Sequence, residues 1–485
     1  MFSNYQTVIP NLRTFEQFND TLVRMFPELF SKKLPDGSYP GVMTITFQVT
    51  DACNLRCTYC YQVNKGVKIM PIGIGKKAID ELLSDELEYC NTKRCPAIVM
   101  DFIGGEPLLA IDEIKELYEY FLTRAIELQH PWAIMHYMSI STNGVLYFEE
   151  KVQKFLHRYR QQIGLSITLD GNKELHDACR IFPDGSPSYD IVIKGIQDWM
   201  KKNPYLGSKI TIAPENVEYL YAAIKHMVEL GYYDINANAV FEQPFTTEHA
   251  TTLYNQLKLI ADYFIENELY FSHYFRMFDH SGFAPLHPSD NKNWCGGNGQ
   301  MLAIDPNGNY YPCLRFMESS LGSAQTPFKI GEVGKKNLAR GEYEDKVACL
   351  SCITRRSQST DECFNCPVAR GCGWCTAYNY QEFGTADKRA THICCMHKAT
   401  SLANVYYWNK LFQKFNVDLY FEMFLPEKDA IEIIGEQEYL ALKTLSNGEN
   451  KLCVNPAAKS GDVYKEIKEK YNIVLEEYEH ENDYQ

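Results

Sequence analysis

Apolar strand-like runs alternate with amphipathic helical segments along the first half of the chain. The runs that predict strands occupy residues 42–49, 97–103, 134–141, 163–169, 209–213 and 234–241. Apolar residues recur at helical spacing between and after them, over residues 74–89, 111–129, 147–161, 189–202, 216–230 and 247–268. Six strands that alternate with helices are typical of an α/β protein with a parallel sheet or an open barrel, in which functional sites lie at the carboxyl ends of the strands.

The pattern changes after about residue 270, where His, Pro, Gly, Asn and Cys become frequent. Asn307-Gly308 separates two short apolar runs and predicts a β-hairpin. A long helix is predicted again only over about 397–424. We therefore expect four parts, which are an N-terminal segment with one helix over 14–30 (1–40), an α/β unit (41–270), a cysteine-rich domain (271–400) and a C-terminal helical region with an acidic tail (401–485).

Composition and charge narrow the choice of partners. The chain has 485 residues, of which 45% are hydrophobic and 23% are charged, as in an ordinary globular protein. Its net charge of -14 disfavours binding to the phosphates of nucleic acids. No run is as long and apolar as a membrane span, and the N-terminus lacks the pattern of a secretory signal. We therefore expect a cytoplasmic protein with no nucleic-acid and no membrane partner.

Cysteine is frequent, with 17 residues, and thirteen of them fall into three groups. The groups are Cys53, Cys57 and Cys60, then Cys295 and Cys313, then Cys349, Cys352, Cys363, Cys366, Cys372, Cys375, Cys394 and Cys395. Disulfides are rare in the cytosol, so grouped cysteines there indicate metal ligands or catalytic thiols. The four cysteines outside these groups are interpreted as small buried hydrophobic residues.

The first group forms a Cys-x3-Cys-x2-Cys loop directly after the first predicted strand. Thiolates are the ligands that iron–sulfur clusters prefer, and three of them this close can bind three irons of a [4Fe–4S] cluster. The fourth iron then stays open to a ligand from outside the protein. A structural zinc site would need a fourth protein ligand, and none is adjacent in the sequence.

This loop, with the aromatic Tyr59 before its last cysteine, resembles the loop of the radical S-adenosylmethionine (SAM) superfamily. The resemblance implies a partial (β/α)6 barrel, which agrees with the six predicted strands. It also implies that the open iron chelates the amino and carboxylate groups of SAM. Reductive cleavage of SAM then produces a 5′-deoxyadenosyl radical, which abstracts a hydrogen atom from the substrate.

Further motifs stand at strand ends, where the superfamily would place its SAM-binding residues. By resemblance, these residues are Tyr59, Gly104, Gly105, Glu106, Ser141, Asn143, Asp170 and Arg180. Glu106 would accept from the SAM amino group, and Arg180 would pair with the SAM carboxylate. Without the resemblance, Asp170 would be interpreted as a turn residue and Arg180 as part of a surface ion pair.

The second and third cysteine groups resemble the SPASM extension of radical SAM enzymes, which binds two auxiliary [4Fe–4S] clusters. The resemblance implies an outer cluster on Cys363, Cys366 and Cys372 with Cys394 or Cys395, and an inner cluster on Cys295, Cys313 and Cys375. Two residues separate the last cysteine pair where the family has three, which leaves the role of Cys375 open. The fourth inner ligand is either supplied by Cys349 or Cys352 or replaced by a substrate thiolate. A zinc ribbon on Cys349, Cys352, Cys363 and Cys366 is the alternative.

Two phrases, TFQVTDACNLRCTYCYQ and DGNKELHDACRIFPDGSPSYD, resemble CXXX-repeat-target peptide maturases and their thioether-forming relatives. The implied function is to join a cysteine sulfur to a carbon within a ribosomally made precursor peptide that contains cysteine. The first alternative keeps the same architecture and is a formylglycine-forming sulfatase maturase or a peptide epimerase, because architecture alone does not fix the reaction. A non-catalytic iron–sulfur or zinc protein is the more distant alternative.

Two further partners follow from this resemblance. Radical SAM chemistry requires an electron donor such as flavodoxin or ferredoxin. Only 52 residues precede Cys53, which is short for the winged-helix domain that binds the leader in many such maturases. We therefore expect leader recognition by another element of the chain or by a separate protein.

Overall fold

The computed structural model describes residues 15–446 except 36–37, 161, 204–206, 288, 294 and 416–419. The acidic tail and Cys453 lie outside these residues. Within the described part, no helix is long and apolar enough to cross a membrane.

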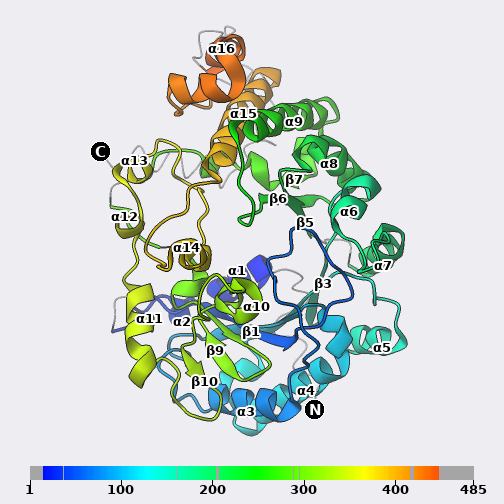
Figure 1. Cartoon of the computed structure of the whole chain (residues 1–485), viewed down its shortest axis with the longest axis vertical. Coiled ribbons are helices and arrows are strands. Elements are labelled where there is room, and N and C mark those ends of the chain that lie inside the picture. Colours follow the sequence, from blue (N-terminus) through cyan, green and yellow to red (C-terminus); the bar gives the residue numbers. More distant parts are fainter. Residues whose placement is uncertain are drawn as a thin grey trace.

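The predicted alternation of strands and helices forms over residues 42–266, and the α/β class is confirmed (Figure 1). The strands are β1 (Val42–Thr50), β2 (Ala97–Gly104), β3 (His136–Thr142), β4 (Ile163–Ile167), β5 (Gly207–Ile212) and β6 (Asp234–Ala239). The helices are α3 (Ile72–Leu83), α4 (Ile111–Glu127), α5 (Glu150–Tyr159), α6 (Lys173–Cys179), α7 (Tyr189–Lys202), α8 (Leu220–Glu229) and α9 (Thr247–Glu266). Helix α6 was not predicted; its seven residues begin after Asn172, whose side chain accepts from the backbone N–H of Leu175 at 3.3 Å.

The six strands are divided between two sheets. One sheet has the order β10-β9-β8-β1-β2-β3-β4 and the other β5-β6-β7. The added strands are β7 (Tyr274–Phe275), β8 (Met301–Ile304), β9 (Asn309–Tyr311) and β10 (Gly331–Glu332). The hairpin predicted at Asn307-Gly308 forms between β8 and β9, and Gly308 has a φ of +79°, which glycine tolerates. Because β8 pairs in parallel with β1, the cysteine-rich part extends the first sheet.

The two faces of the first sheet differ in polarity. Ile98 and Phe102 of β2 point into the apolar core shared with the outer helices. Asp101 lies on the opposite, inner face, in register with Thr46 of β1 and Ser139 of β3. Thr46 donates a hydrogen bond to Asp101 at 3.3 Å. A polar inner face does not collapse into a packed core, so it leaves room for a cavity.

The predicted helix over 14–30 is interrupted at a proline. It forms α1 (Phe15–Met25) and the short α2 (Pro27–Phe30), because proline lacks the N–H that a continuous helix needs. Phe18 and Leu22 of α1 are buried against Val99 and Tyr137, with the Phe18 and Tyr137 rings 5.7 Å apart. This helix therefore covers the inner face of the sheet near the amino ends of its strands.

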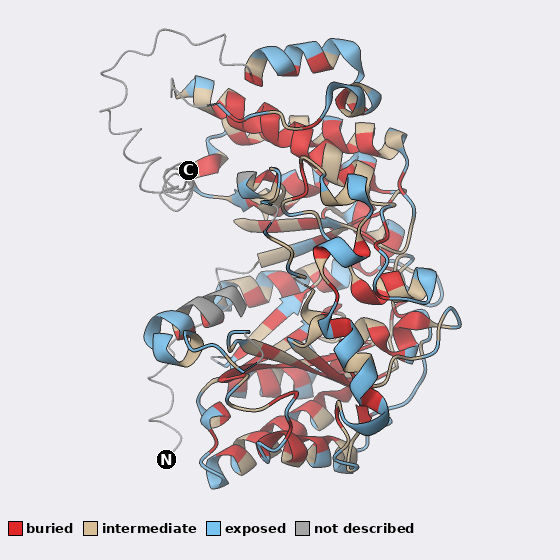
Figure 2. Cartoon of the chain, turned by 90° about the vertical axis from the view of Figure 1, so that its left-hand side faces the viewer, coloured by how far each residue is buried: buried red, intermediate tan, exposed pale blue. Residues whose placement is uncertain are grey.

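Short helices and two long ones follow the hairpin. They are α10 (Glu318–Leu321), α11 (Glu344–Ser351), α12 (Arg355–Gln358), α13 (Asp361–Phe364), α14 (Thr376–Phe383), α15 (Cys394–Lys414) and α16 (Glu427–Ser446). Helices α15 and α16 lie beside α9 at the top of Figure 1, where Lys258 pairs with Glu438 at 2.6 Å and Lys410 pairs with Asp262 at 3.0 Å. Figure 2 shows buried residues along the strands and the helix sides that face them.

Candidate active site

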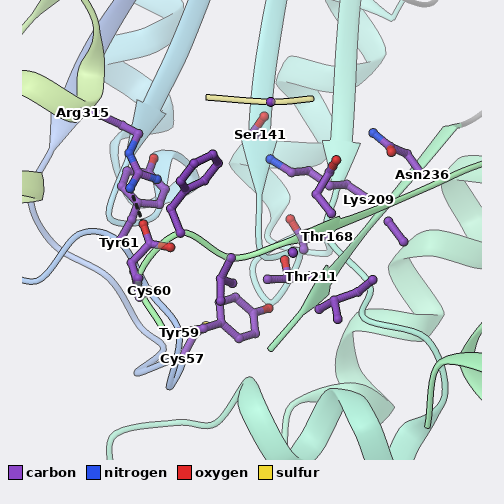
Figure 3. Close-up of a pocket in the computed structure, with 18 of the residues that line it drawn as sticks. Cys57, Tyr59, Cys60, Tyr61, Ser141, Thr168, Lys209, Thr211, Asn236 and Arg315 are labelled. Atoms are coloured by element: carbon purple, nitrogen blue, oxygen red, sulfur yellow. Dashed lines mark hydrogen bonds and ion pairs between the residues drawn. The ribbon is translucent and has the colours of Figure 1, made fainter. Parts of the chain in front are cut away.

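A cavity of about 630 Å³ lies between the two sheets and the cysteine-rich part. Cys53, Cys57 and Cys60 line one side of it, and Arg315 and His397 belong to the wall that the cysteine-rich part and α15 contribute. Figure 3 shows side chains from the cysteine loop and from strands of both sheets pointing into this space. The carboxyl ends of the parallel strands therefore meet at one chamber, as the sequence predicts.

The cysteine loop after β1 is attached to the segment that follows α6. The backbone N–H of Arg56 donates to the carbonyl of Ile181 at 2.7 Å, and the N–H of Thr58 donates to that of Cys179 at 3.0 Å. Burial raises the pKa of the Cys53 and Cys57 thiols. A bound metal would have to supply the free energy that deprotonates them, as thiolate-bound metals do.

The paired glycines allow the end of β2 to approach the cysteine loop. A Cβ atom on Gly105 would lie 2.8 Å from Cβ of Cys53, and one on Gly104 would lie 2.8 Å from the Thr50 side chain. The next residue, Glu106, is buried and lines the cavity. Larger residues in place of the glycines would thus push the cysteine loop away from Glu106.

The carboxylate of Glu106 accepts three hydrogen bonds from nearby groups of the protein. It accepts from the Thr142 hydroxyl at 2.6 Å, from the Asn143 N–H at 2.8 Å and from the Leu108 N–H at 3.0 Å. Burial raises the pKa of Glu106, and these hydrogen bonds lower it. A carboxylate has about four acceptor positions, so one remains for a donor in the cavity.

Ser141 and Asn143 lie beside Glu106 at the end of β3. Ser141 is exposed to the cavity, whereas the Asn143 side chain donates to Asn54 of the cysteine loop at 2.7 Å. Asn143 thereby joins β3 to the loop through its side chain and holds Glu106 through its backbone.

Tyr59, Asp170 and Arg180 form a buried group where the two sheets separate. The Tyr59 hydroxyl donates to Asp170 and accepts from Arg180 at 3.0 Å, and Asp170 also accepts from the Thr211 N–H of β5 at 3.1 Å. Burial raises the pKa of Asp170, and the charge of Arg180 opposes that shift. Asp170 is fully buried behind Tyr59 and Arg180, which line the cavity, so it holds these two side chains in place.

Arg180 keeps an unused donor. Its Nε atom is buried and has no hydrogen-bond partner, although the residue lines the cavity. A buried unpaired donor costs free energy, which an anionic ligand in the cavity would recover. The residues around the first cysteine group thus fit a ligand that has a carboxylate and an amino group.

Polar residues of the inner strand faces were missed in the sequence. Thr168, Lys209, Thr211 and Asn236 line the cavity and are labelled in Figure 3. Lys209 is exposed to it and lies in register with Asn236. The available signal was the alternation of polar with apolar residues inside the runs that predicted β5 and β6.

Arg315, which was also missed, lies two residues after Cys313 and connects the two sides of the cavity. Its guanidinium forms an ion pair with Glu242, which follows β6, and lies 5.3 Å from the centroid of the Tyr61 ring (Figure 3). Burial raises the pKa of the Cys375 thiol, and the charge of Arg315 opposes that shift. Arg315 therefore lies both at the cavity and close to Cys375.

The remaining predicted thiols form two sets. Cys295, Cys313 and Cys375 are close enough for the charge of one thiolate to raise the pKa of the others. Gly297 lies between two of them, because a Cβ atom on it would be 3.6 Å from the sulfur atoms of both Cys295 and Cys313. We call these three the inner set. Cys363, Cys366, Cys372 and Cys394 are likewise electrostatic neighbours and form the outer set.

The other three predicted ligands are Cys395, Cys349 and Cys352. The Cys395 thiol points to the carbonyls of Phe245 and Thr246, at 3.8 and 3.7 Å. Cys349 and Cys352 are exposed near the end of α11, while their neighbour Leu350 packs into the core around Cys313. Because α11 also contacts Gly296–Asn298, which directly follows Cys295, the assignment of Cys349 or Cys352 as the fourth inner ligand stays a prediction.

The thiols in the described part of the chain do not form a preformed site for a single metal ion. Among the described residues, no three Cys, His, Asp or Glu side chains are close enough to ligate one metal ion. Thiols around a four-iron cluster stand further apart, because the cluster lies between them. The zinc ribbon of the alternative interpretation would need the exposed Cys349 and Cys352 beside Cys363 and Cys366, and this arrangement is not seen in the described part of the chain.

Comparison with known proteins agrees with this geometry. Residues 47–227 match the model of the Radical SAM superfamily. An uncharacterized protein of Methanocaldococcus jannaschii, MJ0907, is 29% identical over 215 residues, which are 44% of this chain and 68% of that protein. A serine-type anaerobic sulfatase-maturating enzyme of Bacteroides thetaiotaomicron is 23% identical over 372 residues, which are 70% of this chain and 84% of the enzyme.

A solved structure shares the fold. Native anSMEcpe with bound AdoMet and Cp18Cys peptide superposes with a TM-score of 0.56 at 18% identity, over 77% of this chain and 98% of that chain. Residues 47–227 therefore form a radical SAM domain, which implies a [4Fe–4S] cluster and SAM as cofactors. This domain and its similarity to maturases point to an enzyme that modifies peptides or proteins.

Proposed function

We propose that this enzyme is a peptide maturase that joins a cysteine sulfur of a ribosomally made precursor peptide to a carbon of another residue. The observation that carries the proposal is the cavity of about 630 Å³, which reaches from the first cysteine group to Arg315 and His397. A peptide side chain in this cavity would lie between the first cysteine group and Arg315, which is close to Cys375 of the inner set. Bound SAM and its cluster supply the one-electron chemistry that removes a hydrogen atom from the substrate.

We assign the residues of the first site as follows. Cys53, Cys57 and Cys60 would hold the cluster, and Arg180 would bind the SAM carboxylate with its unused donor. The remaining acceptor position of Glu106 would take the SAM amino group. Gly104, Gly105, Ser141 and Asn143 would shape and line the site, and Asp170 would position Tyr59 and Arg180.

The inner set supports the choice of a thioether over other products. It has three thiols, so a fourth position of an inner cluster would be available to the thiolate of the substrate. Arg315 would stabilise such a thiolate, because its guanidinium already lies beside Cys375. With a four-thiol outer cluster, the enzyme would hold three [4Fe–4S] clusters in all.

The polar inner strand faces would bind the peptide. Lys209 and Asn236 present donors to the cavity, which suits the carbonyl and carboxylate groups of an extended segment. The partners we propose are a cysteine-containing precursor peptide and an electron donor such as flavodoxin or ferredoxin.

A second candidate function is formylglycine formation in a sulfatase. The specific observation in its favour is Glu242, a carboxylate that lines the cavity and whose partner there is Arg315. Such a carboxylate is suited to accept the proton of a substrate cysteine or serine. The sulfatase-maturating relative, of which the chain covers 84%, supports this candidate equally.

One experiment separates the two functions. The anaerobically reconstituted enzyme is incubated with SAM, dithionite and either a cysteine-rich precursor peptide or a cysteine-containing sulfatase peptide. We expect about 12 iron and 12 sulfide per chain, 5′-deoxyadenosine, and a precursor that has lost two hydrogen atoms and no longer reacts with a thiol reagent. An aldehyde on the sulfatase peptide, with the precursor unchanged, would establish the second function instead.

A further inference from the structure

Two buried arginines accompany the four thiols of the outer set. Arg389 is 7% exposed and Arg355 is 2% exposed. Both interact electrostatically with thiols of this set, Arg389 with Cys372 and Cys394 and Arg355 with Cys363. Buried arginines are uncommon, because a guanidinium loses its hydration when it is buried.

Arg389 binds a thiol directly. Its Nη2 atom lies 2.9 Å from Sγ of Cys372 and donates to the carbonyls of Cys372 and Gly373 at 3.2 and 3.3 Å. The guanidinium also stacks 4.6 Å from the centroid of the Trp374 ring. These contacts fix the charge of Arg389 at the sulfur atom.

Arg355 stands at the start of α12 and is an electrostatic partner of Cys363 and Cys366. It donates to the carbonyl of Phe364, whose ring centroid lies 4.7 Å from its guanidinium carbon. Phe364 directly follows Cys363 in α13. The Nε atom of Arg355 is buried without a hydrogen-bond partner.

Carboxylates do not compensate these charges. Over the described residues, neither Arg355 nor Arg389 forms an ion pair with Asp or Glu. The carboxylate of Asp290 acts on Arg355 more weakly than Cys363 does, and the two arginines repel each other. Two buried cations without a carboxylate partner are costly, and an anionic group close to both would offset that cost. Burial raises the pKa of Cys372 and Cys394, so the thiols of the outer set become that anion when a metal cluster deprotonates them.

We propose that Arg355 and Arg389 are the cationic partners of an anionic iron–sulfur cluster on Cys363, Cys366, Cys372 and Cys394, and that they raise its reduction potential. This inference rests on the proposed function, because it assumes the outer cluster. Reduction adds negative charge to a cluster, and a nearby buried cation stabilises the reduced form more than the oxidised one. A hydrogen bond to a ligating sulfur acts in the same direction.

The consequence concerns the direction of electron flow. A cluster with a raised potential accepts an electron more readily than it donates one. The outer cluster would therefore take up the electron that the substrate releases when its new bond forms, and it would pass that electron to an acceptor outside the chain.

The chain offers a matched control for the test. Arg356 is adjacent to Arg355 and lies 4.9 Å from the same Phe364 ring, but its side chain is 49% exposed and pairs with Asp361. We would prepare the full chain as wild type, R389Q, R389K, R355Q and R356Q, and titrate each with dithionite while recording electron paramagnetic resonance spectra. The outer-cluster signal is defined as the part of the spectrum that is lost in C394S.

We expect the midpoint potential of that signal to fall in R355Q and to fall further in R389Q, whose guanidinium touches Cys372. R389K keeps the charge and should remain closer to wild type, and R356Q should not differ from wild type. Equal potentials in R355Q, R389Q and R356Q would overturn the inference. If neither C394S nor C395S loses iron or signal, there is no outer cluster and the inference is wrong, while 5′-deoxyadenosine formation in the same samples still tests the radical SAM activity separately.

Discussion

The first cysteine site and the outer set are both groups of thiols with arginine beside them, but their arginines have different surroundings. Arg180 stands beside Asp170 and Tyr59 and keeps one donor unused at the edge of a cavity. Arg389 has no carboxylate partner in the described part of the chain, and it donates to a thiol. The first site is therefore arranged to take a ligand from outside, whereas the outer set is arranged to hold an anion permanently.

The number of thiols at each site agrees with an open first site and a closed outer set. Three thiols line the cavity at the first site, and four gather in the outer set, none of which is among the described residues that line the cavity. A metal site with an incomplete protein shell keeps a position for substrate, and one with a complete shell does not. We infer that bond-breaking chemistry occurs at the first site and that the outer set transfers electrons.

The largest expected effect follows from removing the three thiols of the first site, which we call the open site because it keeps a position for a ligand. The triple variant C53A/C57A/C60A should make no 5′-deoxyadenosine from SAM and dithionite, because no ligand of the first cluster remains. It should still fold, since these residues lie in a loop and are only half-buried. Product formation is measured by chromatography and folding by circular dichroism.

The control is C349A/C352A, which removes exposed thiols outside both sets. This variant should keep the wild-type rate and the wild-type iron content. SAM cleavage at the wild-type rate in the triple variant would show that the open site lies elsewhere.

The next effect concerns two adjacent cysteines at the start of α15. C394S should lose about four irons per chain, the content of one [4Fe–4S] cluster, whereas C395S should keep them. Cys394 faces the outer set, and Cys395 faces the carbonyls of Phe245 and Thr246. Iron and sulfide analysis of the two variants decides the point, and loss of iron from C395S alone would exchange the two assignments.

The pair also shows where prediction from sequence stops. Its spacing is compatible with either cysteine as the ligand, and the choice depends on where α15 begins. Successive helical side chains point about 100° apart, so a helix that starts at Cys394 directs only one of the two thiols at the outer set. The predicted start at about 397 left both residues in a loop.

Local patterns predicted the strands well because hydrophobic periodicity is a local property. The start of β1 was predicted at its observed residue, and the end differed by one residue. The pairing of β8 with β1 joins segments that are about 250 residues apart, and no local pattern encodes such a contact. The buried arginines were missed for the same reason, since Arg355 and the exposed Arg356 are indistinguishable without the fold.

A smaller effect is expected when the open site loses its arginine. R180A should weaken SAM binding about tenfold to a hundredfold, the worth of a hydrogen bond to a charged group. The iron content should not change, because Arg180 does not ligate the cluster. Equilibrium dialysis with SAM in the absence of reductant measures the affinity.

The control is R158A, an exposed arginine that pairs with Glu119 on the outer helices. If R180A and R158A bind SAM equally well, Arg180 serves only to hold Tyr59 and Asp170.

The smallest effect distinguishes the part of the cavity that binds peptide from the part that binds SAM. K209M removes a cation from the inner face of β5 while keeping a side chain of similar length. We expect KM for the modified peptide to rise about fivefold, from the loss of about 1 kcal/mol at a partly exposed contact, with kcat and SAM affinity unchanged. K201M on α7, whose lysine is exposed on the outside, is the control. A weakened affinity for SAM with an unchanged KM would instead make Lys209 part of the SAM site, and the open site would then extend one strand further than Arg180 indicates.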